Sequence, residues 1–144
     1  MNWDQDHSLS ERLATDAESA RRSGQMEKAD ELYRQAGSAE AAAFAALPPD
    51  RHRTRGVTAV SAVALWYKGR QYPAAERLAH TCLAGGDLPP FAAAQLQDLL
   101  HLIWAAHAAA KDPLLTSGEK KILLLAGILG AAIVAGAYYM SKYF

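Results

Sequence analysis

The side chains best suited to catalysis or metal binding are few and scattered in this sequence. The five histidines lie at positions 7, 52, 80, 101 and 107, and the single cysteine is Cys82. His101 and His107 are six residues apart, which does not place two side chains on one helical face around a metal ion. No H-E-x-x-H pair, glycine-rich phosphate loop, nucleophile elbow or C-x-x-C pair occurs. We therefore predict that the protein is not an enzyme and uses no metal ion or cofactor.

Basic residues offer clearer binding candidates. The densest cluster is Arg51, Arg53 and Arg55, which suits an acidic protein or lipid headgroups, or is simply the solvated start of a helix. Three arginines without interleaved aromatic residues do not favour nucleic acid. Lys68, at the end of the same predicted helix, is a further candidate.

Composition limits the architecture. The chain has 144 residues and a formal charge of zero, but residues 1–50 carry ten acids and five bases, whereas residues 51–121 carry five acids and nine bases. A single cysteine excludes an intrachain disulfide and fits a reducing compartment. The first residues are polar and acidic, so we expect no secretory signal.

Apolar residues recur at helical spacing, and no segment alternates with period two. This predicts an all-α domain at residues 1–110. Its helices are expected at about 9–23, capped by Ser8 with Glu11, then from 26 to the proline pair at 48–49, from Asp50 as a cap to 68, from 72–73 to 84, and from 88–90 onward. The third should be central and most buried, and Trp66 and Trp104 should lie in the core. Short breaks favour antiparallel helical hairpins.

Two stretches share a layout, at residues 24–36 and 69–82. In the first, Gly24 precedes Ala29, Tyr33 and Ala36, and this resembles the turn and second helix of a tetratricopeptide repeat. The second stretch is looser, with Ala79 in place of the aromatic residue and one extra residue after its glycine. The two alanines at 29 and 75 are 46 residues apart, whereas the family's period is 34.

The resemblance implies stacked hairpins that bind other proteins, with the fifth helix covering the end of the array. It also implies a role for Arg21 and Arg22, because they match the groove-facing end of a repeat's first helix, where such domains grip acidic peptide ends. Alternatively, these two arginines only stabilise a helix C-terminus.

The last part of the chain is strongly apolar. Nineteen uncharged residues, from Ile122 to Met140, follow two lysines, and a helix of that length reaches roughly 28 Å, close to the thickness of a bilayer's hydrocarbon core. Tyr138 and Tyr139 lie where aromatic side chains favour the headgroup level. We predict a linker at 111–119 and a single-pass tail anchor at 120–144. The helical domain would then be cytoplasmic, and the Ala- and Arg-rich composition suggests a bacterial cytoplasmic membrane.

Small residues recur every four positions in this apolar segment, at Gly127, Ala131 and Ala135. Such a face permits close helix packing and self-association in a bilayer. The sequence therefore leaves two functions open. The first is a membrane-anchored adaptor that binds another protein. The alternative is an effector whose spans oligomerise and permeabilise the bilayer, with the helical domain as its sensor or oligomerisation module.

Replacing Gly127 and Ala131 together by leucine separates these two functions. For an adaptor, we expect membrane retention and partner capture to be unchanged, because bulkier residues still suit lipid. An effector would instead lose its higher-order cross-linked species and any toxicity to the host cell. Cross-linking in membranes measures the higher-order species, and growth curves measure toxicity. If the double substitution abolished the higher-order species or the toxicity, the result would contradict the adaptor.

Overall fold

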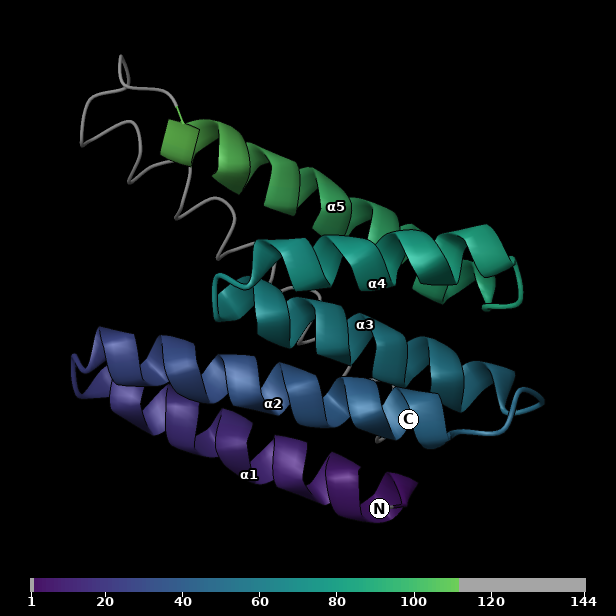
Figure 1. Ribbon diagram of the computed structural model, residues 1–144, viewed down its shortest axis with the longest axis horizontal. Coiled ribbons are helices and arrows are strands. Elements are labelled where there is room, and N and C mark those ends of the chain that lie inside the picture. Colours follow the sequence, from purple (N-terminus) through teal and green to yellow (C-terminus); the bar gives the residue numbers. More distant parts are fainter. Residues whose placement is uncertain (1, 112–144) are drawn as a thin grey trace.

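The computed structural model describes residues 2–111, which form five α-helices without a strand. These are α1 (Trp3–Arg22), α2 (Met26–Ala46), α3 (His52–Lys68), α4 (Tyr72–Gly85) and α5 (Pro90–Lys111). Short connections make consecutive helices antiparallel in the stack (Figure 1). The all-α prediction is confirmed for this part of the chain.

No helix among residues 2–111 combines the length and the apolar character needed to cross a bilayer. The predicted span at 120–144, and all of its linker after Lys111, lie outside the described residues. The tail anchor therefore stays a prediction.

Two predicted caps were wrong. The side chain of Asn2 accepts a hydrogen bond from the backbone N–H of Gln5 at 3.0 Å, and α1 begins at Trp3. Ser8 consequently lies inside α1 and caps nothing. At α3 the N-cap residue is Arg51, without a side-chain cap hydrogen bond, so Asp50 does not cap this helix.

α2 continues without a break through Gly37, as the apolar periodicity predicted. Glycine weakens a helix interior by roughly 1 kcal/mol relative to alanine, so its presence needs a packing reason. A Cβ added at Gly37 would lie 2.5 Å from Cδ1 of Trp66. The missing side chain lets the Trp66 ring of α3 approach α2.

α3 is the central helix, as predicted. It packs against α2, α4 and α5, whereas α1 packs mainly against α2. Most of the core comes from α3 and α5, and its largest wholly buried aliphatic side chains are Val63, Leu96, Leu99 and Ile103. Trp66 is partly buried against this core. Trp104 is not in the core, which contradicts the prediction.

The α1–α2 and α3–α4 turns have the same hydrogen-bond pattern. Gly24 N–H donates to Arg21 O at 3.0 Å, and Arg70 N–H donates to Tyr67 O at 3.0 Å; each following glutamine also donates to the preceding helix. Arg70, not Gly69, therefore occupies the position of Gly24, and the extra residue expected in the second stretch does not exist. The tetratricopeptide resemblance itself stays a prediction.

Backbone angles support this equivalence. Gly24 has φ +76° and Arg70 has φ +58°, and Arg70 is the only non-glycine residue with positive φ in residues 2–111. The left-handed conformation costs a residue with a Cβ roughly 1–2 kcal/mol. The second turn thus retains an arginine where glycine would be less strained.

The α3–α4 turn also depends on Gly69. A Cβ there would lie 2.8 Å from the backbone N of Arg34 and 2.9 Å from the backbone O of Asp30, both in α2. We expect Gly69→Ala to lower the free energy of unfolding by roughly 1–3 kcal/mol, because a helix backbone cannot yield locally. Urea unfolding of the whole chain in detergent, followed by circular dichroism, measures this.

Gly85→Ala is the matched control. The nearest atom to its added Cβ is Oδ1 of Asp87 at 2.6 Å, and that carboxylate can rotate away. Its stability should be unchanged or slightly higher. Equal unfolding midpoints for Gly69→Ala and the wild type would contradict the close approach of this turn to α2.

Candidate interaction surfaces

The structure divides the six predicted partner-binding residues between the two ends of α3. This helix has 17 residues and is therefore roughly 25 Å long. Near its first residue lie Arg51, Arg53 and Arg55. Near its last residue lie Lys68 itself and the end of α1, with Arg21 and Arg22. The six basic residues therefore form two separate candidate surfaces.

Arg55 is engaged within the fold. Its Nη1 donates to the backbone O of Leu47 at 2.9 Å, and its guanidinium lies 4.4 Å from the ring centroid of Phe44. It thereby holds the end of α2 to the start of α3. The guanidinium of Arg53 lies 5.9 Å from the ring centroid of Phe91 in α5. Arg51 and Arg53 are both exposed at the helix start, whereas Arg55 is partly buried.

At the other end, one carboxylate joins three helices. Oε1 of Glu18 in α1 accepts a hydrogen bond from the hydroxyl of Tyr33 in α2 at 2.5 Å. The same oxygen lies 3.3 Å from Nζ of Lys68 in α3. This Nζ also lies 5.2 Å from the ring centroid of Tyr33, within cation–π range. Lys68 is thus a structural residue as well as a candidate contact.

The pKa values of this cluster follow from its contacts. Burial raises the pKa of Glu18, but the Tyr33 hydrogen bond and the charges of Lys68 and Arg21 outweigh burial and lower it overall. Burial, and then the hydrogen bond to Glu18, raise the pKa of Tyr33. At neutral pH Glu18 is therefore ionised and Tyr33 is its hydrogen-bond donor.

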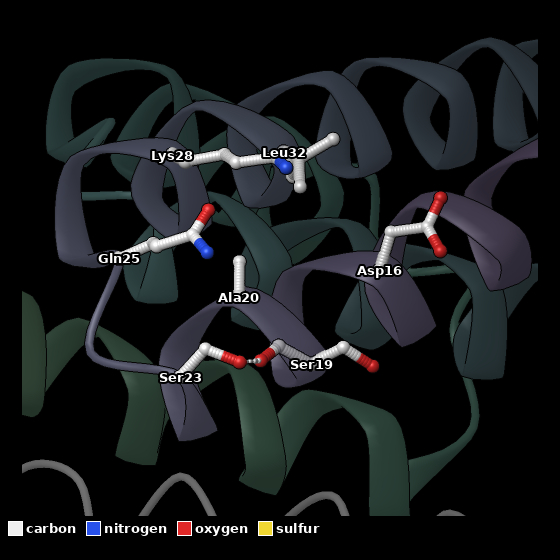
Figure 2. Close-up of a pocket in the computed structure, with 7 residues that line it drawn as sticks. All are labelled: Asp16, Ser19, Ala20, Ser23, Gln25, Lys28 and Leu32. Carbon is white, nitrogen blue, oxygen red and sulfur yellow. Dashed lines mark hydrogen bonds between the residues drawn. The ribbon is translucent and has the colours of Figure 1, made fainter.

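A hollow of about 450 Å³ lies between the end of α1 and the start of α2 (Figure 2). Its lining residues are mainly polar: Asp16, Ser19, Ala20, Ser23, Gln25, Lys28 and Leu32. The hydroxyl of Ser23 donates to Ser19 O at 3.0 Å and is thus used within α1. The hollow lacks the apolar enclosure typical of small-molecule sites.

A surface that the sequence did not predict lies on α4 and α5. Trp104 is 46% exposed, and its Nε1 donates to Oε1 of Glu76 at 2.9 Å. Its ring centroid lies 5.8 Å from that of His101 and 6.2 Å from that of His80. We call these four residues the Trp104 face. A signal was present in the sequence, because Trp104 follows two polar residues, His101 by three positions and Gln97 by seven, which places all three on one helical face.

Other predicted sites are not tested by the geometry. Within residues 2–111, no group of three or more His, Cys, Asp or Glu side chains could hold a metal ion. The predicted membrane residues lie outside the described range: Ile122, Gly127, Ala131, Ala135, Tyr138 and Tyr139.

Comparison with known proteins adds no family to this description. No family model matches the chain, and neither the curated proteins nor the solved structures yielded a match.

The lowered pKa of Glu18 gives a prediction for acid stability. A carboxyl group whose pKa is lower in the folded state stabilises the fold above its unfolded pKa, and this contribution disappears as pH falls through the folded value. We expect Glu18→Gln to be less stable than the wild type at neutral pH. The difference should shrink below about pH 4.5, the ordinary value for this group.

Urea unfolding at neutral pH and at roughly pH 3 measures this difference. Glu27→Gln is the control, because Glu27 is exposed. This substitution should not reproduce the loss of unfolding free energy that we expect for Glu18→Gln. A gap for Glu18→Gln that stays constant over this pH range would contradict the assigned cluster.

Proposed function

We propose that this protein is a non-catalytic adaptor. A C-terminal span holds its helical domain at the cytoplasmic face of a membrane, and the domain binds another protein through the Trp104 face. The observation that carries the proposal is the exposed Trp104 side chain, fixed by its hydrogen bond to Glu76.

Trp104 has the properties of a binding hot spot. A tryptophan contributes a large apolar area together with one polar group, and it is enriched among the residues that dominate interface energies. The hydrogen bond to Glu76 and the flanking rings of His80 and His101 restrict its rotamers. Less conformational entropy is then lost when a partner covers it.

The membrane part of the proposal is supported by sequence. Trp104 lies seven residues before Lys111, the last described residue of α5, so that roughly 10 Å of helix separates them. The uncharged stretch from Ile122 begins shortly afterwards. A partner on the Trp104 face would accordingly be held close to the bilayer. The buried free thiol of Cys82 suits a reducing compartment.

A photoreactive amino acid in place of the exposed Gln97, seven residues before Trp104 on the same face of α5, tests the partner site. In native membranes we expect one discrete adduct with another protein, and Trp104→Ala should reduce that adduct at least tenfold. Loss of a hot-spot tryptophan weakens binding by roughly 2–4 kcal/mol, which exceeds a factor of ten. Quantitative mass spectrometry of the adduct gives the measurement.

Met26→Ala is the matched control, because Met26 is also an exposed apolar residue, at 43%, but lies at the start of α2. Its adduct yield should equal that of the parent protein. A yield that is insensitive to Trp104→Ala, in a variant whose circular dichroism is unchanged, would contradict the proposed binding face.

A further inference from the structure

One end of the helix stack combines cations from three separate parts of the chain. α1, α3 and α5 all end there, together with the turns that begin α2 and α4 (Figure 1). Close contacts tie these segments together: Arg70 Nε lies 3.3 Å from Asp30 Oδ2, and the rings of Tyr72 and His107 are 5.1 Å apart. We call this set the cationic end: Arg21, Arg22, Lys28, Lys68, Arg70 and Lys111.

The acids near this end do not cancel its charge. Glu18 faces Lys68, Asp30 faces Arg70, and Glu31 pairs with Arg34 at 2.8 Å. Two further acids lie near this end: Glu27 in the first turn of α2, and Asp16, which lines the hollow together with Lys28. With Arg34 included, seven cations face five acids here.

The opposite end of the stack has a different balance. It carries four aspartates, in the first turn of α1 and in the loops after α2 and α4: Asp4, Asp6, Asp50 and Asp87. Its three arginines include Arg55, whose guanidinium bonds to backbone carbonyl groups. The domain is therefore electrically asymmetric along its helix axes.

Arg70 is the member that the fold alone does not explain. Its backbone has φ +58°, whereas Gly24 holds the equivalent position in the first turn. Its side chain is 57% exposed, and such exposed ion pairs contribute little to stability. Glycine would relieve the backbone strain, so an arginine here points to a use for its charge.

We propose that the cationic end docks on anionic lipid headgroups of the membrane that holds the protein, an inference that rests on the proposed tail anchor. The place where α5 ends selects this partner. Lys111 leaves the domain at the cationic end, and ten residues separate it from Ile122. Even fully extended, this connection reaches only roughly 35–40 Å. The span therefore holds the cationic end nearest to the bilayer, whereas bringing the opposite end there would require this connection to run back, almost fully extended, along the roughly 30 Å length of α1 or α2.

Tethering makes a weak attraction sufficient. An anionic leaflet attracts basic residues within about one Debye length, roughly 8–10 Å at physiological salt. The short connection keeps the local lipid concentration high, so that no tight site is needed. Docking would fix the direction of the helix axes relative to the membrane and turn the α2–α3 loop away from it.

Headgroup quenching in reconstituted vesicles tests this orientation. The whole chain carries a fluorophore on an engineered cysteine, either Ser23→Cys at the cationic end or Ala45→Cys near the end of α2, while the native Cys82 is buried. Vesicles are neutral phosphatidylcholine or contain about one-third phosphatidylserine, with a quencher on a lipid headgroup. We expect at least twofold stronger quenching at residue 23 in anionic vesicles, reversed by salt, and no such difference at residue 45.

Arg70→Gly separates docking from folding. Because glycine relaxes the left-handed turn, we expect the melting temperature to rise or stay unchanged while quenching at residue 23 falls; Arg70→Lys should keep the quenching. Arg51→Gln is the matched charge control at the other end and should change nothing. Protein that floats with both vesicle types, yet is quenched equally in them, would overturn the docking proposal but not the tail anchor. An acidic protein would then be the partner of the cationic end. Protein that floats with neither would overturn the tail anchor, and this proposal with it.

Discussion

The close approach of α2 and α3 is the contact on which the rest of the structure depends. Gly37 admits the ring of Trp66, and Gly69 brings the α3–α4 turn against the backbone of α2. Arg34 then donates to Gly69 O at 3.2 Å across the same contact. Because α3 also packs against α4 and α5, this one approach fixes where the cationic end and the Trp104 face lie relative to the first hairpin.

The helices could largely be predicted from the sequence, because periodicity and helix stops are local signals. Pro48 ends α2, and Gly86, with φ +71°, ends α4. Starts were less predictable. The capping box at Ser8 predicted a start six residues too late, because the observed hydrogen bond makes Asn2 the cap of α1. The position of α3 as the central helix followed from apolar residues around much of its circumference.

The candidate surfaces were harder to predict, because they depend on contacts between helices. Trp104 follows Leu100 by four residues, a spacing that favours the core, yet it also lies on the face of exposed His101. The packing of α5 on α3 and α4 leaves the Trp104 side chain exposed and outside the core. Likewise, the paired glycines at 24 and 69 suggested one alignment of the two turns, and only the backbone hydrogen bonds identified Arg70 as the equivalent of Gly24. Charge density alone did not distinguish Arg55, which is used within the fold, from Arg51.

The proposed function requires that lipid surrounds the carboxyl-terminal part of this chain while the helical stack remains in the cytoplasm. Alkaline extraction of native membranes, combined with protease treatment of sealed vesicles of known orientation, measures this most directly. We predict that the whole chain resists extraction, and that protease removes the helical domain only from the cytoplasmic side. Release of the intact chain as a monomer by alkali, without detergent, would contradict it.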